Sequence, residues 1–306
     1  MMRRAPHVLM IFLDGVGIGR DDPGSNPFFA APMPSMRGLF GGAMPHLGDA
    51  TIDVPGLSVT AIDATLGVPG LPQSGTGQVA LLTGANASRE IGKHFGPFPY
   101  STLKPLLGSK NIFSRLDAAG RKGFYANAFP EIYFEHMRSR KGRMTAIPLA
   151  WTMSGRSLND GAALAEGGAL SADITNARWR MMGYPEMPII DGREAGRRLC
   201  ALAERNDFVL YEFYLTDHAG HNKSMEEAKH VLGMLDELIG GVLASYDPAS
   251  MLLVITSDHG NLEDLTTKSH TRNPVPLIAA GEASREFASG IRSLTDVAPG
   301  LMKLLA

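Results

Sequence analysis

The stretch VLYEFYLTDHAGH, residues 209–221, leads from a mostly apolar run into a cluster of acidic and imidazole side chains. A second stretch of the same design, LLVITSDHGN, covers residues 252–261, and His270 follows it. The apolar runs predict buried strands, and open α/β sheets place their sites at the carboxyl ends of parallel strands. Because unpaired carboxylates are costly to bury, the two clusters predict a divalent metal centre at this edge.

The alternation of apolar runs and helical patterns extends along much of the chain. Apolar runs that predict strands cover residues 7–13, 123–128, 208–214, 251–256 and 276–280. Patterns that predict helices cover residues 112–120, 192–204, 224–245 and 293–305. Strands that alternate with helices predict an α/β fold with a doubly wound, mainly parallel sheet flanked by helices.

The middle of the chain differs in composition. It carries a basic cluster at 138–143 and Gly- and Ala-rich loops at 159–172. We interpret residues 95–188 as an inserted region that includes a small cap, placed between the two parts, 1–94 and 189–306, of a metal-binding catalytic α/β domain. Residues 20–70 are rich in Gly, Pro and Met without periodicity, which predicts long ordered loops with short helices.

Bulk composition restricts the partners and the compartment. The chain has 306 residues, 44% of them apolar, which is enough for a large core. Its formal net charge of -2 favours neither nucleic acid nor a membrane surface as partner. A single cysteine, Cys200, excludes an internal disulfide framework, and no apolar run approaches the roughly 20 residues of a membrane span. We therefore expect a cytoplasmic protein; the sequence makes no prediction of its oligomeric state.

Three aspartates and three histidines supply the ligands for the predicted metal centre: Asp14, Asp217, Asp258, His221, His259 and His270. These are too many ligands for one metal with an open coordination position, but they suit two. Mixtures of carboxylate and imidazole favour Zn or Mn over the all-oxygen sites of Ca or Mg. The predicted cofactors are therefore two divalent ions, Mn or Zn.

Ser74 is the candidate nucleophile. It lies in the stretch QSGTG, 73–77, which predicts a tight turn before a short helix over 78–83. A serine hydroxyl is a weak nucleophile near neutral pH, and a bound metal activates it as it activates water. The N-terminus of the helix favours an anion nearby. Thr76 in the same turn is the alternative nucleophile. Together these features indicate phosphoryl or sulfuryl transfer.

These motifs resemble the alkaline phosphatase superfamily of metalloenzymes, and most closely its branch of cofactor-independent phosphoglycerate mutase and phosphopentomutase. The similar windows are 8–19, 70–90, 208–222 and 252–306, with the motifs FLDGVG, SGTGQ, TDHAGH, TSDHGN and HTRNPVP. The resemblance implies one metal held by Asp217, His221 and His270. It implies a second metal held by Asp14, Asp258 and His259, with Ser74 Oγ as a further ligand and as the atom that is transiently phosphorylated.

The size of the cap and its basic residues bear on which substrate and which reaction the resemblance implies. Mutases of this branch carry a larger cap with several phosphate-gripping basic residues, and the shorter cap here favours hydrolysis. The candidate substrate-binding residues are Lys93, His94, Arg138, Arg140, Lys141 and Arg143. We expect a phosphomonoesterase or phosphomutase that acts on a small phosphorylated metabolite such as a sugar or glycerate. The alternatives are a phosphodiesterase or phosphonate hydrolase on the same scaffold, and a non-catalytic metal-binding protein.

Overall fold

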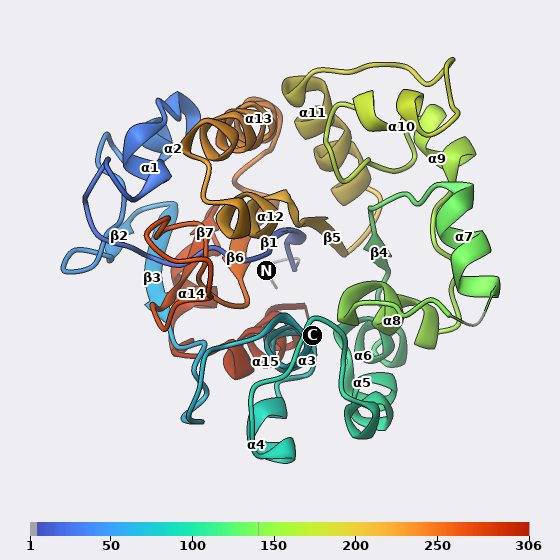
Figure 1. Ribbon diagram of the computed structural model, residues 1–306, viewed down its shortest axis with the longest axis horizontal. Helices are drawn as coiled ribbons and strands as arrows, with labels where there is room; N and C mark the ends of the chain where they lie inside the picture. Colours follow the sequence, from blue (N-terminus) through green and yellow to red (C-terminus); the bar gives the residue numbers. More distant parts are fainter. Residues whose placement is uncertain (1–4, 140, 306) are drawn as a thin grey trace.

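A seven-stranded sheet with helices on both faces forms the centre of the computed structural model, which describes residues 5–139 and 141–305 (Figure 1). The strand order is β2-β3-β7-β6-β1-β5-β4. The strands are β1 (His7–Leu13), β2 (Ile52–Val54), β3 (Leu57–Ile62), β4 (Gly123–Tyr125), β5 (Phe208–Phe213), β6 (Met251–Ser257) and β7 (Val275–Ala280). Strands β4, β5, β1 and β6 are parallel, and β7, β3 and β2 continue the sheet by antiparallel pairing. The predicted α/β class with a mainly parallel sheet is confirmed.

Alternate residues of the central strands pack into two separate cores. Leu9 and Ile11 of β1 face α11 (Gly192–Ala203) and α13 (Met225–Leu243). Val8 and Met10 belong to the opposite core, with α3 (Ser74–Thr83) and α15 (Leu294–Leu305). Because side chains alternate across a strand and both faces are covered, the central strands read as continuous apolar runs.

Most of the remaining helices are short and lie around these two layers (Figure 1). They are α1 (Pro27–Ala30), α2 (Pro34–Leu39), α4 (Ala87–Ile91), α5 (Lys104–Lys110), α6 (Ile112–Ala118), α7 (Glu131–Arg138), α8 (Ala146–Met153), α9 (Gly161–Ala165), α10 (Ala177–Met181), α12 (Leu215–Asn222) and α14 (Ser284–Ala288), with a 3-10 turn at Ser101–Leu103. Among the described residues, no helix combines the length and the apolar character that a bilayer crossing requires.

Two strands lie where the sequence predicts only loops and short helices. β2 and β3 form a hairpin in residues 20–70, and Gly56 in its turn has a φ of 81°, a conformation that favours glycine. β3 pairs along its whole length with β7, more than 200 residues away in the sequence. The expectation of loops was wrong because this pairing is tertiary, and short half-buried strands carry a weak local signal.

The segment that carries the candidate nucleophile Ser74 also differs from the prediction, because it is helical from Ser74 onward. Helix α3 begins at Ser74, so residues 74–77 form its first turn and not a turn ahead of it. The glycines serve close approach: a Cβ at Gly75 would lie 2.3 Å from the carbonyl oxygen of Phe98, and one at Gly77 would lie 2.9 Å from that of Asp258. Glycine within a helix costs stability, but here it lets the backbone of α3 contact two loops of the site. The helix ends at Thr83, as predicted, and Gly84 is its C-cap.

The inserted region 95–188 contributes to both the main layers and a separate small core. β4 is the edge strand of the main sheet, and α5 and α8 contact α3. A small core formed by residues 128–187, which includes Leu164, Trp179 and Met187, lies outside the two main cores. The division of the chain into domains, and the interpretation of part of this region as a cap, stay predictions.

Candidate metal centre

Three aspartates follow the ends of three neighbouring parallel strands. Strand register aligns Leu13 with Phe213 on one side and with Ser257 on the other, so β1, β5 and β6 end at the same level. Asp14 and Asp258 follow β1 and β6 directly, and helix α12, which starts after β5, carries Asp217 in its first turn. The sheet thus brings Asp14 together with two carboxylates that lie more than 200 residues later in the sequence.

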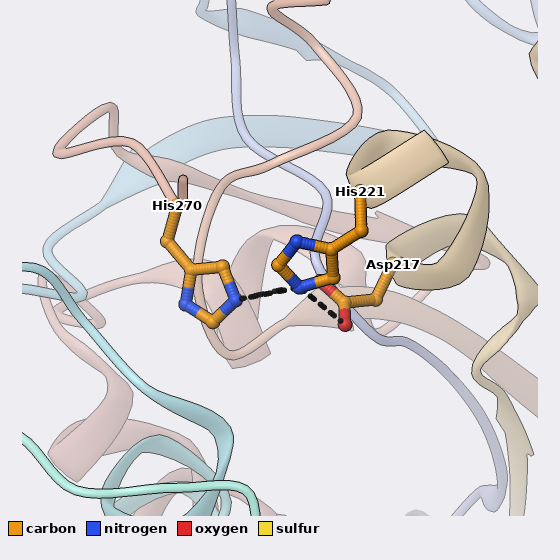
Figure 2. Close-up of side chains that lie close together, drawn as sticks. All are labelled: Asp217, His221 and His270. Carbon is orange, nitrogen blue, oxygen red and sulfur yellow. Dashed lines mark hydrogen bonds and ion pairs between the residues drawn. The ribbon is translucent and has the colours of Figure 1, made fainter. Parts of the chain in front are cut away.

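Asp217, His221 and His270 form the first group of ligand atoms. Asp217 and His221 lie one turn apart on α12, and His270 approaches from the loop that precedes β7 (Figure 2). The Oδ2 atom of Asp217 lies 3.3 Å from Nε2 of His221, and its Oδ1 lies 3.7 Å from Nε2 of His270. The three residues each offer an atom within 4.8 Å of the others, so they can share one cation.

The tautomers of His221 and His270 leave both Nε2 atoms free to bind that cation. Nδ1 of His221 lies 2.8 Å from the carbonyl oxygen of Lys268, and Nδ1 of His270 lies 2.7 Å from that of Pro72. A carbonyl oxygen only accepts, so each Nδ1 carries the hydrogen and each neutral ring has a lone pair on Nε2. The two Nε2 atoms are 3.2 Å apart, where two lone pairs repel unless a cation accepts both. Histidines oriented by carbonyls in this way are typical metal ligands.

His259 is the centre of the second group. Its Nε2 lies 2.9 Å from Ser74 Oγ, 3.3 Å from Asp14 Oδ1 and 3.7 Å from Asp258 Oδ2. Asp14, His259 and Asp217 offer ligand atoms within 4.8 Å of one another. Asp217 therefore belongs to both groups, while Asp258 lies beside the second. The six predicted ligands and the predicted nucleophile all converge on one edge of the sheet.

Two carboxylate oxygens in this cluster accept no hydrogen bond from the described residues, although both lie near Nε2 of His259. Asp14 and Asp258 are buried, and within the described part of the chain Oδ1 of Asp14 and Oδ2 of Asp258 accept no hydrogen bond. Buried carboxylate oxygens without hydrogen bonds are costly, and a divalent cation is the usual compensation. The residues present therefore fit divalent metal ions.

Burial and neighbouring charges also shift the pKa values of the side chains in this cluster. Burial, together with the neighbouring Asp258, raises the pKa of Asp14 to about 7. Burial disfavours a charged His259, but Asp258 and Asp14 outweigh it and raise the pKa of His259 to about 10. Burial and the positive charge of His259, whose ring stacks on that of His270 with centroids 3.8 Å apart, lower the pKa of His270 to about 4. A metal that binds Asp14 and His259 must therefore displace the protons that these two groups favour.

Hydrogen bonds of the two candidate nucleophiles favour Ser74 over Thr76. Ser74 is the first residue of α3, so its hydroxyl lies at the positive end of the helix, next to His259. Thr76 is fully buried, and its hydroxyl donates to the carbonyl of Gln73 and accepts from the amide of Phe95, both at 3.2 Å. The hydroxyl of Thr76 is therefore engaged with the protein itself.

Two residues next to the ligands have supporting roles that the sequence does not predict. Asn261 donates its side-chain amide to Asp217 Oδ1 at 2.7 Å. Glu263 is buried and accepts hydrogen bonds from the amides of Gly17 and Asn261 at 2.9 and 2.8 Å, which ties the loop after β1 to the loop after β6. Asn261 stands in the motif TSDHGN, which was a signal for its role, whereas nothing local distinguishes Glu263 from an exposed loop carboxylate.

Glu212 is a third residue without a predicted role. It is buried in β5, accepts a hydrogen bond from the hydroxyl of Tyr125 at 2.6 Å, and lines the cavity described next. Its backbone amide donates a hydrogen bond to Oδ1 of Asn127 at 2.8 Å. The signal for Glu212 was a charged residue inside an otherwise apolar strand, which requires a buried partner.

A cavity of about 660 Å³ opens beside the candidate metal ligands and is lined by Asp14, Asp217 and His221, among others. Of the basic residues predicted to bind substrate, Arg143 lines this cavity. The others are Lys93, His94, Arg138 and Lys141, which are not among its lining residues, and Arg140, which lies outside the described residues. A role for these residues in binding stays a prediction.

Comparison with known proteins agrees with this geometry. Residues 185–306 match the model of the metalloenzyme superfamily. A 2,3-bisphosphoglycerate-independent phosphoglycerate mutase from Desulforudis audaxviator is 30% identical over 128 residues, which cover 40% of this chain and 25% of that protein. The match therefore spans about a quarter of the length of this curated relative.

Solved structures share the fold over nearly the whole chain. The PH0037 protein from Pyrococcus horikoshii superposes with a TM-score of 0.58 at 17% identity, covering 99% of this chain and 98% of that one. Alkaline phosphatase from the Antarctic bacterium TAB5 superposes with a TM-score of 0.56 at 13% identity and covers 99% of both chains. The matched family model, the mutase relative and the shared fold together support membership of the alkaline phosphatase superfamily of metalloenzymes.

Proposed function

We propose that the protein is a phosphoryl-transfer enzyme that uses two divalent ions, Mn or Zn, and Ser74 as its nucleophile. The observation that carries the proposal is the position of Ser74 Oγ, 2.9 Å from Nε2 of His259 and at the N-terminus of α3. The likeness to the mutase relative supports it, since that protein acts on a phosphorylated metabolite.

The residues divide the chemistry between them. Asp217, His221 and His270 would hold one ion, and Asp14, Asp258 and His259 the other, with Ser74 beside the second. When bound, two such ions lower the pKa of a hydroxyl and stabilise the charge of a transferring phosphoryl group. Ser74 Oγ then forms a bond to phosphorus while the bond from phosphorus to the substrate alcohol breaks, and the serine proton ends on the departing alcohol. Attack by water on the phosphoserine releases phosphate and restores the hydroxyl.

Hydrolysis is the favoured outcome for this phosphoserine. A mutase must hold the intermediate and exclude water until the alcohol takes the phosphoryl group back, which requires a closing cap. The small core around Trp179 is the part of the described chain with the character of a cap, and it is built from short helices. We therefore propose a phosphomonoesterase, with phosphomutase activity as the alternative outcome.

Replacement of the nucleophile tests this proposal. With p-nitrophenyl phosphate and added Mn or Zn, we expect Ser74→Ala to lower kcat/KM by at least about 10³-fold, because the covalent route is lost. Ser109→Ala, at an exposed serine of α5, is the matched control and should retain activity. Equal activity of Ser74→Ala and wild type would contradict the assignment. Bis-p-nitrophenyl phosphate and 3-phosphoglycerate, assayed beside the monoester, separate diesterase and mutase activity.

A further inference from the structure

We infer that the substrate carries its phosphate on an apolar alcohol with an alkyl or aryl body, and not on a sugar or glycerate. This inference rests on the proposed function, because it names the leaving group for the same site. It departs from the small polar metabolite that the sequence resemblance implies. The evidence is the cavity beside the candidate metal ligands.

The walls of the cavity are rich in aromatic and aliphatic side chains. These side chains belong to the segment around Phe98 and to the region of α7, α8 and α10. This region lies on the β4 side of the sheet (Figure 1). Aromatic and aliphatic residues make up half of the lining, among them Phe129, Tyr133 and Trp179. Because the same cavity is lined by Asp14, Asp217 and His221, a phosphate at the metal ligands would place its alcohol against these walls.

The rim of the cavity exposes apolar surface to solvent. Ile132, Met182 and Tyr214 all line the cavity, and they are 65%, 43% and 43% exposed. Large apolar side chains gathered around a concave site are typical of ligand-binding surfaces, because their exposure is costly until a ligand covers them. An alkyl or aryl group that leaves the metal site would cover this rim.

The charged residues of the cavity fit one anionic group better than two. Arg143 and Arg178 are its cationic side chains within the described residues, and the Arg143 guanidinium lies 5.8 Å from the centre of the Phe98 ring. Glu212 and Asp173 also line the cavity. A substrate carboxylate such as that of glycerate would face these acidic groups in addition to the metal ligands, whereas an uncharged alkyl group would not.

A series of n-alkyl phosphates tests the inference directly. Ethyl, butyl and hexyl phosphate have nearly the same ester chemistry and differ in apolar surface. If the alcohol packs on the cavity walls, kcat/KM of the metal-loaded protein should rise about fourfold for each buried methylene. Glycerol 3-phosphate, of similar size to butyl phosphate, should be the poorer substrate of the two. A flat series, or preference for glycerol 3-phosphate, would overturn the inference.

Variants at the rim localise the effect. Ile132→Ser and Met182→Ser change exposed side chains, so folding should be little affected. We expect each to lower the ratio of kcat/KM for hexyl phosphate to that for ethyl phosphate by about fivefold. Val54→Ser, at a residue 48% exposed on the opposite edge strand β2, is the matched control and should keep the wild-type ratio. If Ile132→Ser and Met182→Ser keep the wild-type ratio, as the control does, the alkyl group binds elsewhere and the inference is refuted.

A binding measurement separates this inference from the proposed function. Hexylphosphonate and methylphosphonate cannot be hydrolysed as esters, so calorimetric titration of the manganese-loaded protein reports affinity with or without turnover. Tighter binding of hexylphosphonate by at least about 30-fold supports an apolar subsite even if no ester is hydrolysed, in which case only the proposed function fails. Equal affinity for the two phosphonates would refute the subsite even if p-nitrophenyl phosphate is hydrolysed.

Discussion

Asn261 donates its side-chain amide to both the Oδ1 atom and the backbone carbonyl of Asp217, at 2.7 and 3.2 Å. The close approach depends on Gly220, where a Cβ would lie 2.7 Å from Cγ of Asn261. Asp217 belongs to both groups of candidate ligands. Asn261 therefore fixes the orientation of the one carboxylate that the two groups share.

Loss of this amide should weaken metal binding without removing a ligand. We expect Asn261→Ala to reduce the affinity for Mn or Zn by about 10- to 100-fold, because residues that orient ligands have effects of this size. Calorimetric titration of metal-stripped protein measures the affinity. Asn206→Ala is the control, because its amide bonds the carbonyl of Leu202, just before β5 and away from the ligands. Unchanged affinity in Asn261→Ala would contradict the proposed role.

Glu263 should contribute to stability through the two loops that it joins. Glu263→Ala leaves the buried amides of Gly17 and Asn261 without their acceptor, which should lower the free energy of unfolding by roughly 2 to 4 kcal/mol. Urea denaturation checks this value. Glu186→Ala, at an exposed carboxylate, should change it by less than about 0.5 kcal/mol. A Glu263→Ala protein as stable as Glu186→Ala would show that the two loops are held by other contacts.

Glu212 gives the stability of the protein a defined pH dependence. Burial raises its pKa from 4.5 to about 7, although the hydrogen bond from Tyr125 opposes the shift. The folded state thus favours the protonated acid, and the stability that this provides below pH 4.5 is lost as the pH rises through about 7. Relative to wild type, Glu212→Gln should gain stability across this window, by up to about 3 kcal/mol. Urea denaturation of metal-stripped protein at several pH values measures the difference, and parallel pH profiles would contradict the prediction.

The sequence predicts the layers of the fold well where burial is continuous. The expected helix over 224–245 is found at Met225–Leu243, and the expected strand over 251–256 at Met251–Ser257. Both have a periodicity that follows from their own buried faces. The β2–β3 hairpin is different, because β3 is stabilised by β7 and no local pattern contains that partner.

The same distinction applies to the metal centre. The positions of the three aspartates are predictable because each one follows an apolar strand: Asp14, Asp217 and Asp258. Parallel strands end at the same edge of the sheet, so these side chains come together there. The bond between Gly17 and Glu263 spans 246 residues, so the sequence gives no hint of it. Likewise, the apolar walls of the cavity come from segments that are far apart in the chain and that acquire a common surface only through folding.

We propose that six side chains on one edge of the sheet hold two divalent ions. The most direct test is to strip the protein of metal, reload it with manganese or zinc, remove free ions and count the bound ions per chain by elemental analysis. We expect two ions in the wild type, two in the control His218→Ala, whose side chain is 67% exposed, and one in His221→Ala. One ion or fewer per wild-type chain would contradict a two-metal centre.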